Sequence, residues 1–218
     1  MGRTGASRGR GAEGSRIVKL VDALSVLLRL NQPVFETADA AVLLGVEKAH
    51  ASKMITRLAA AGHLLALRRG VWGFPGRLEA MAIPEWLTAP QPAYVSLQSA
   101  LYHHGMISQI PSSIYAVSLA RTRRYVTPIG VVSVHHIAPE FFFGFETLGE
   151  KGIRMASPEK ALLDVFYLAP ARTRLFCKLP EVEKPGGFNV REARRMIARI
   201  PFAARRSLVA EQFEQWLR

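Results

Sequence analysis

The segment from Ala156 to Leu168, ASPEKALLDVFYL, places two carboxylates and one amine within a short apolar stretch. Glu159, Lys160 and Asp164 are residue types that serve in general acid–base catalysis and in metal binding. On an α-helix, however, Glu159 and Asp164 lie five residues apart, or about 140° around the axis. This spacing is poor for two carboxylates that share a metal ion, and no nucleophile converges with them. We therefore expect the chain not to be an enzyme.

Each polar residue of this segment also has a structural explanation. Ser157 is a favourable N-cap, and Pro158 suits the first helical position, where no backbone hydrogen bond is lost. Glu159 in the first turn is favoured by the helix dipole. Lys160 and Asp164 are four residues apart, and we expect them to form a weak ion pair at the surface. A nucleic-acid-processing enzyme that uses these three charged residues stays open as an alternative.

The histidines and the single cysteine lack the spacing of a metal site. His103 and His104, like His135 and His136, are direct neighbours, which point about 100° apart on a helix. On a strand they face opposite sides of the sheet. Cys177 has no thiol-enzyme signature, and one cysteine excludes an internal disulfide. We expect no metal and no cofactor.

The charge balance points to a polyanionic partner. The chain of 218 residues carries 29 Lys and Arg against 17 Asp and Glu, a net charge of +12. Such a surplus favours binding to DNA or RNA. No apolar run approaches the roughly twenty residues that span a bilayer, and no apolar block precedes Ile17 as in a signal peptide. We expect a cytoplasmic protein with no membrane partner.

The first 75 residues predict a disordered arm followed by a DNA-binding domain. Residues 1–15 are basic and Gly-rich, with too little apolar surface to fold alone. Residues 16–75 alternate helical and extended patterns, and Thr37 is the expected N-cap of the second helix. The expected elements are helices over about 17–30, 37–45 and 47–61 and hairpin strands over 64–67 and 71–74. This order is that of a winged helix-turn-helix.

The third predicted helix separates an apolar side from a polar one. Val46, Ala51, Ile55 and Leu58 recur at helical spacing and are expected to face the core. Polar and basic side chains lie opposite, where a recognition helix meets the major groove. The predicted DNA-binding residues are Lys48, His50, Ser52, Lys53, Thr56 and Arg57, together with Arg68 and Arg69 of the hairpin. The cations are expected to contact phosphates rather than bases. A domain for protein contact is the alternative.

The sequence of residues 76–218 predicts a linker and a second domain. Residues 76–92 contain four prolines and are expected to form a linker, with one short helical piece near 77–81. Residues 93–218 mix helices and strands without a regular βαβ repeat, which predicts an α+β fold. The expected strands are 114–119, 123–127, 130–137 and 152–156, and Asn189 with Glu192 resembles a capping box.

Five segments of the chain, in this order, resemble the AbiEi antitoxins of type IV toxin–antitoxin (abortive infection) systems. The segments are YVSLQSALYHHGMI, RRYVTPIGVVSVHHI, FFFGFE, ASPEKALLDVFYL and LFCKLPEVE. The resemblance implies an N-terminal domain that represses its own operon by binding inverted repeats in promoter DNA. It also implies that residues 93–218 form an antitoxin domain, which neutralises a nucleotidyltransferase-like toxin without a stable complex.

The resemblance suggests a surface for toxin antagonism, and two further interpretations stay open. The residues of this possible antitoxin surface are Tyr94, His104, Glu159, Lys160 and Asp164. One alternative function is a partner- or ligand-responsive winged-helix transcriptional regulator without a toxin. The C-terminal arginines are either a solvated basic face or a second polyanion-binding surface. These arginines are Arg191, Arg194, Arg195, Arg199, Arg205 and Arg206.

Overall fold

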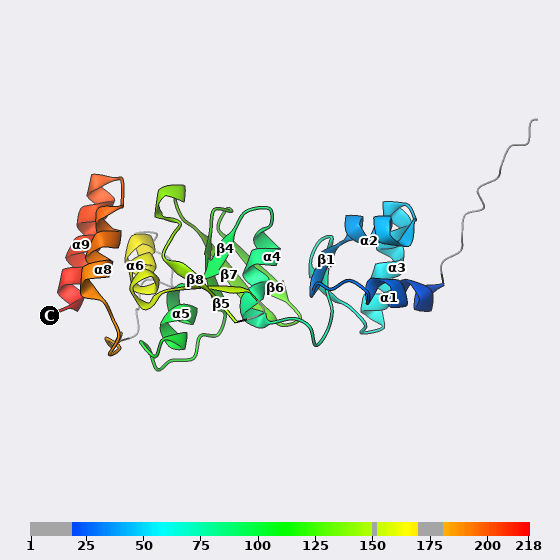
Figure 1. The fold of residues 1–218 in the computed structure, drawn as a ribbon, viewed down its shortest axis with the longest axis horizontal. Coiled ribbons are helices and arrows are strands. Elements are labelled where there is room, and N and C mark those ends of the chain that lie inside the picture. Colours follow the sequence, from blue (N-terminus) through cyan, green and yellow to red (C-terminus); the bar gives the residue numbers. More distant parts are fainter. Residues whose placement is uncertain (1–18, 150–151, 170–180) are drawn as a thin grey trace, which may run out of the picture.

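The computed structural model of the protein describes residues 19–149, 152–169 and 181–218, which form a mixed α+β structure with two sheets. The N-terminal helices and the helices α8 and α9 lie at opposite ends, with the larger sheet between them (Figure 1). The predicted α+β class is confirmed at this level. The predicted N-terminal arm and Cys177 lie outside the described residues.

The N-terminal half contains three helices and a three-stranded antiparallel sheet in the order β1-β3-β2. Its elements are α1 (Leu20–Leu27), β1 (Val34–Glu36), α2 (Thr37–Leu44), α3 (Lys48–Ala60), β2 (Leu65–Arg68) and β3 (Val71–Gly73). The helices and hairpin predicted here are all present. Ala51, Ile55 and Leu58 are buried in the core, as predicted, and Met54 is buried beside them.

The predicted N-cap of α2 is wrong by one residue. Glu36 is the N-cap, and its backbone N–H donates to the Asp39 carboxylate at 2.9 Å. A capping box therefore closes the helix between Glu36 and Asp39, and Thr37 already has helical geometry. The hydroxyl of Thr37 is engaged with the hairpin instead.

The second half is built on a six-stranded sheet in the order β6-β7-β5-β4-β9-β8. The pairs β4–β9 and β5–β7 are parallel, and the other neighbours are antiparallel. The strands are β4 (Ala93–Val95), β5 (Ile114–Ser118), β6 (Arg123–Thr127), β7 (Gly130–His136), β8 (Phe145–Leu148) and β9 (Ile153–Ala156). The four predicted strands are confirmed, while β4 and β8 were not predicted.

Helices lie against this sheet, and α8 and α9 lie at the end of the molecule away from the N-terminal helices (Figure 1). They are α4 (Ile83–Thr88), α5 (Leu97–His103), α6 (Pro158–Leu168), α8 (Val190–Ala198) and α9 (Ala203–Trp216), with single 3₁₀ turns η1 (Ala80–Ala82) and η2 (Pro139–Phe141). Ser157 and Asn189 are N-caps, as predicted, because their side chains accept the backbone N–H groups of Lys160 and Glu192. The capping box predicted for Asn189 and Glu192 is incomplete, since the Asn189 backbone N–H donates to Glu159 instead. Within the described residues, no helix has both the length and the apolar composition needed to cross a bilayer.

The predicted linker is largely folded. The short helical piece predicted near 77–81 overlaps the 3₁₀ turn η1 (Ala80–Ala82), and the α-helix α4 follows directly, where Pro84 suits the first turn. Ile83 and Leu87 of this helix are buried. Residues 76–92 therefore include a packed helix.

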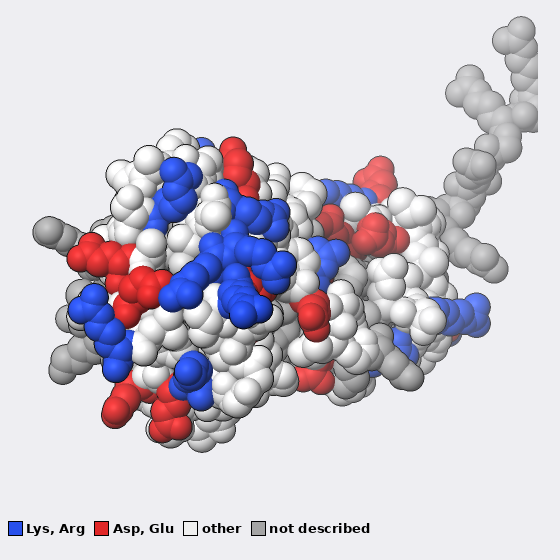
Figure 2. Space-filling model, turned by 60° about the vertical axis from the view of Figure 1, so that its left-hand side comes forward, with Lys and Arg blue, Asp and Glu red and all other residues white. Residues whose placement is uncertain are grey.

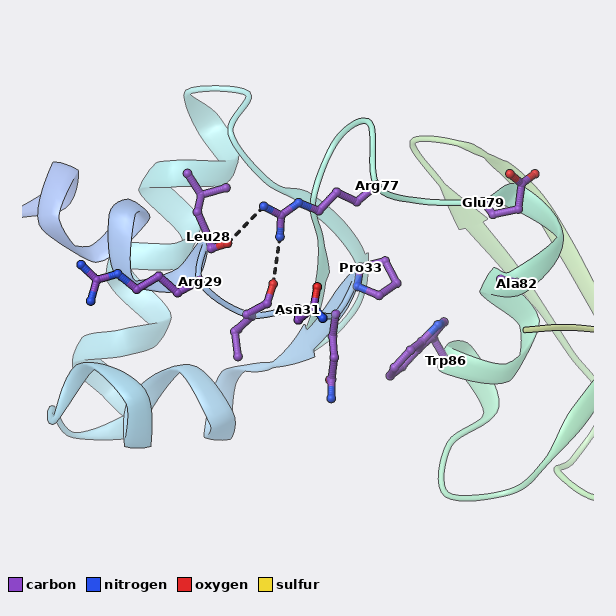
Figure 3. Close-up of a pocket in the computed structure, with 10 residues that line it drawn as sticks. Leu28, Arg29, Asn31, Pro33, Arg77, Glu79, Ala82 and Trp86 are labelled. Atoms are coloured by element: carbon purple, nitrogen blue, oxygen red, sulfur yellow. Dashed lines mark hydrogen bonds between the residues drawn. The ribbon is translucent and has the colours of Figure 1, made fainter. Parts of the chain in front are cut away.

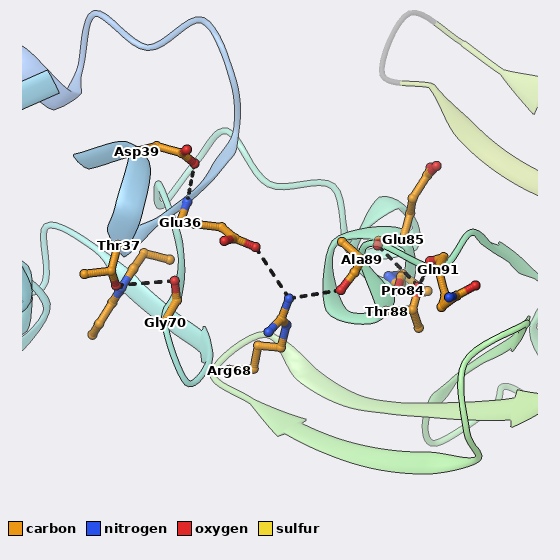
Figure 4. Close-up of polar contacts among 11 residues, drawn as sticks. Glu36, Thr37, Asp39, Arg68, Gly70, Pro84, Glu85, Thr88, Ala89 and Gln91 are labelled. Carbon is orange, nitrogen blue, oxygen red and sulfur yellow. Dashed lines mark hydrogen bonds and ion pairs between the residues drawn. The ribbon is translucent and has the colours of Figure 1, made fainter. Parts of the chain in front are cut away.

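The two halves share one apolar core at this helix. Residues from the small sheet, α4 and β7 are buried together, and β2 lies against β6. The buried members are Val34, Leu67, Val71, Ile83, Leu87, Val132 and Val134. The Arg68 guanidinium adds a polar link, since it donates to the Ala89 carbonyl at 3.3 Å and lies 3.7 Å from the Glu36 carboxylate (Figure 4).

Candidate nucleic-acid interface

Helix α3 turns its polar side to solvent because its apolar residues recur at helical spacing on the other side. Burying that apolar side against α1 and α2 leaves a basic face outside. The exposed residues on it are Lys48, His50, Lys53, Thr56 and Arg57, and Ser52 is half-buried. The six residues predicted on this helix thus share one accessible surface.

The β2–β3 hairpin is fixed beside α2 by hydrogen bonds at its turn. Gly70 has a φ of 79°, in the left-handed region that glycine adopts without strain. The backbone N–H and the hydroxyl of Thr37 donate to the Gly70 carbonyl at 2.9 and 3.3 Å (Figure 4). The indole N–H of Trp72 donates to the Thr37 hydroxyl at 2.8 Å. The turn that carries exposed Arg69 is therefore held in place.

A groove of about 640 Å³ separates the hairpin from the N-terminal part of α3. Lys48 and Ser52 line it from the helix, and Arg69 lines it from the hairpin turn. The fold thus brings together predicted residues that lie about twenty positions apart in the sequence. Lys53, Arg57 and the others follow along the outer face of α3, beyond the groove residues.

Arg68 differs from its neighbour Arg69. It borders the groove, but its side chain is only 28% exposed, and its guanidinium contacts Glu36 and the Ala89 carbonyl. These contacts direct Arg68 toward the second half of the molecule. Sequence reasoning missed Glu36, although the spacing of Glu36 and Asp39 is that of a capping box.

The residues of the possible antitoxin surface do not form a surface. Tyr94, Glu159, Lys160 and Asp164 are buried, and His104 is half-buried. The predicted surface ion pair is wrong for the same reason, since Lys160 and Asp164 are both 0% exposed. Helix α6 is enclosed by α5, α8, α9 and the sheet, so its polar residues are covered together with its apolar ones.

The buried residues form a hydrogen-bonded cluster around one carboxylate. The Lys160 ammonium pairs with Asp164, whose other oxygen accepts the hydroxyls of Tyr94 and Ser96 at 2.9 and 2.7 Å. The ammonium also lies 3.4 Å from the centre of the Phe141 ring, a favourable cation–π position. All donors of the cluster thus converge on Asp164.

Burial dominates the electrostatics of this cluster. Loss of hydration lowers the pKa of Lys160 to about 8, although Asp164 opposes the shift. Burial also raises the pKa of Asp164 and moves the pKa of Tyr94 well above its ordinary value. Perturbed groups of this kind occur in active sites, but here neither charged group has exposed surface through which to reach a substrate.

The remaining two residues of this set tether neighbouring elements. Nε2 of His104 lies 2.7 Å from the Ala156 carbonyl, which joins α5 to β9. A Glu159 oxygen accepts the backbone N–H of Asn189 at 2.6 Å, which joins α6 to α8. Among residues 19–149, 152–169 and 181–218, no three His, Cys, Asp or Glu side chains cluster as metal ligands.

Comparison with protein-family models and with curated proteins finds no match for the chain. The resemblance to AbiEi antitoxins therefore stays a sequence-based expectation.

Proposed function

We propose that the N-terminal half is a winged helix-turn-helix that binds double-stranded promoter DNA and represses transcription. The observation that carries this proposal is the exposed basic face of α3 beside the fixed hairpin turn with Arg69. A single α-helix fits the major groove of B-DNA, and a neighbouring hairpin then reaches the adjacent backbone.

The side chains divide between two kinds of contact. Lys48, Lys53 and Arg57 are exposed cations, and with Arg69 they suit phosphate oxygens on both sides of the groove. The groups that suit base edges are the hydroxyls of Ser52 and Thr56 and the imidazole of His50. The Thr56 hydroxyl donates to the Ser52 carbonyl at 2.8 Å, so it meets a base as an acceptor.

We further propose that the second half is an antitoxin domain, as the resemblance of its segments suggests. In this proposal the chain neutralises a nucleotidyltransferase-like toxin and does not form a stable complex with it. Burial of Lys160 and Asp164 assigns them to holding α6 among α5, α8 and α9. The antitoxin activity then belongs to the outer surfaces that these helices display.

A pocket between the halves favours a ligand-responsive regulator as the second candidate. It has a volume of about 500 Å³ and lies between the α1–β1 loop and α4. Trp86 lies opposite Asn31 and Pro33 across it, and Arg77 donates to the carbonyls of Leu28 and Leu30 at 3.1 and 2.9 Å (Figure 3). A ligand here would contact both halves.

Binding of the purified protein to a duplex from its own promoter tests the DNA proposal. We expect tighter binding than to a scrambled duplex, with a logarithm of the affinity that falls linearly with the logarithm of salt concentration. The double variant Lys53→Ala/Arg57→Ala should lose this binding. Lys184→Ala/Arg191→Ala removes the same charge at the opposite end and should bind as the wild type does. Wild-type binding by the first variant would exclude α3 as the DNA-binding helix.

Co-expression with a nucleotidyltransferase-like protein from the adjacent gene tests the antitoxin proposal. We expect the chain to restore growth, and Lys53→Ala/Arg57→Ala to restore it equally well when expression is held constant. Absence of rescue by the wild type would leave the ligand-responsive regulator as the better proposal. In that case, ligands that bind at Trp86 should change its fluorescence and the affinity for promoter DNA together.

A further inference from the structure

Helix α8 carries a stripe of arginines on its outer face. Arg191, Arg195 and Arg199 recur every four residues, so they lie along one side over about 12 Å. The opposite side of the helix is buried through Ala193, Met196 and Ile197. Since the apolar side fixes the helix orientation, the three arginines are exposed.

This end of the molecule has a strong positive charge. Residues 190–218 contain seven arginines and three glutamates, with no lysine or aspartate. Two of the glutamates are engaged, since Glu192 pairs with Arg195 and Glu214 accepts both donor groups of Arg194 at 2.9 and 3.0 Å. Figure 2, which turns this end toward the viewer, shows Lys and Arg side chains gathered on its surface.

Two flat groups lie next to the stripe. The Phe202 side chain, at the start of α9, is 64% exposed. The Arg199 guanidinium lies 3.5 Å from the centre of the Phe143 ring, which holds its plane against the aromatic surface. Aromatic rings and guanidinium planes are the two side-chain surfaces on which unpaired bases stack.

The turn that carries Phe202 is held by two further arginines. Arg205 donates to the Tyr167 carbonyl at 2.8 Å, and Arg206 donates to the Ile200 carbonyl at the same distance. Both bonds fix the start of α9 to its surroundings. Phe202 is therefore an exposed aromatic side chain on a turn that these two hydrogen bonds hold in place.

From this arrangement we infer that the α8–α9 surface binds a single strand of nucleic acid. The arginine stripe suits the phosphate backbone, and Phe202 and Arg199 suit unstacked bases. A duplex keeps its bases paired and offers no base face to Phe202. This surface also lies at the opposite end of the molecule from α3 (Figure 1). An acidic protein would pair with the arginines but give Phe202 no stacking partner.

Fluorescence anisotropy of the full-length protein tests this inference. The probe is a labelled, unstructured 12-nucleotide RNA, compared with single-stranded DNA of the same sequence and with a double-stranded RNA. We expect both single strands to bind more tightly than the double-stranded RNA, with an affinity that falls as salt rises. Phe202→Ser should weaken binding at least about fivefold, because base–aromatic stacking contributes about 1–3 kcal/mol. Phe202→Trp should bind as well as the wild type or better.

Two further variants separate this surface from the DNA interface. Arg191→Ser/Arg195→Ser should weaken RNA binding and reduce its salt dependence, while promoter binding stays unchanged. Lys53→Ala/Arg57→Ala should weaken promoter binding and leave RNA binding unchanged. Equal RNA affinity of the wild type and Phe202→Ser would overturn the inference, as would loss of RNA binding in the α3 variant. Binding of the double-stranded RNA as tight as that of the single strands would also overturn it.

Discussion

Lys160 and Asp164 form an ion pair from which water is excluded, so removing one partner leaves the other charge without compensation. Breaking a buried pair of this kind typically costs about 3–5 kcal/mol. We expect Lys160→Met to lower the free energy of unfolding by about this amount, measured by urea denaturation. The double variant Lys160→Met/Asp164→Asn should be more stable than Lys160→Met, because no charge is left buried and the amide oxygen can still accept from Tyr94 and Ser96. If the losses in unfolding free energy of the two single variants add up to the loss in the double variant, the two charges are not coupled.

The depressed pKa of Lys160 makes stability depend on pH in a defined direction. The folded protein releases the Lys160 proton near pH 8, whereas the unfolded chain retains it up to about 10.5. The unfolded state therefore binds more protons in this window, and the free energy of unfolding rises with pH.

We expect this rise to reach at most about 1.4 kcal/mol per pH unit between pH 8 and 10. The raised pKa values of Tyr94 and Asp164 act in the opposite direction, beginning above the ordinary pKa of each group. Denaturation of Lys160→Met/Asp164→Asn provides the reference, since it lacks both charges. A wild type whose stability falls relative to this reference across the window would contradict the assigned direction.

At the scale of elements, the hydroxyl of Thr37 links α2 to the hairpin through Gly70 and Trp72. Thr37→Val keeps the shape but leaves the indole N–H of Trp72 without its acceptor. Trp72 is half-buried, and a typical intramolecular hydrogen bond contributes about 0.5–1.5 kcal/mol to stability. We expect a loss of this size in urea denaturation and a weaker affinity for promoter DNA, since the turn with Arg69 is less well fixed. The matched control Thr56→Val, on the exposed side of α3, should leave stability nearly unchanged.

The sequence predicts helix caps and buried helix faces well, because these depend on residues that are close together in the chain. Ser157 and Asn189 cap their helices, and the apolar spacing of α3 gives its buried side, because these features need only neighbouring residues. The strand β4, three residues long, has no such signal. It exists because β5 and β9 pair with it on both sides.

Burial was the property that the sequence did not predict for the charged residues. The pattern of α6 is compatible with a surface helix, and only packing by α5, α8 and α9 places Lys160 and Asp164 inside. The polar face of α3 was predicted correctly, because its basic residues have no partner helix on that side. Contacts between distant segments, such as that of Arg68 with Ala89, had no local signature.

At the scale of the whole molecule, the shared core predicts that both halves unfold together. Leu67 of the hairpin is 2% exposed and packs in the cluster that also contains Val132 and Val134 of β7. Leu67→Ala should lower the free energy of unfolding by about 2–5 kcal/mol. Calorimetry should still show one transition, with equal calorimetric and van't Hoff enthalpies. Two resolved transitions in the wild type would mean that the halves are independent.

The shared core also bears on how such a chain changes over generations. A DNA-binding module joined by a loose tether can be exchanged by recombination, because nothing else in the protein depends on its surface. Here Val34 and Leu67 complete a core with Leu87 and Val132, so a foreign hairpin would meet a mismatched neighbour. A substitution on one side of this core therefore alters the packing of residues on the other side.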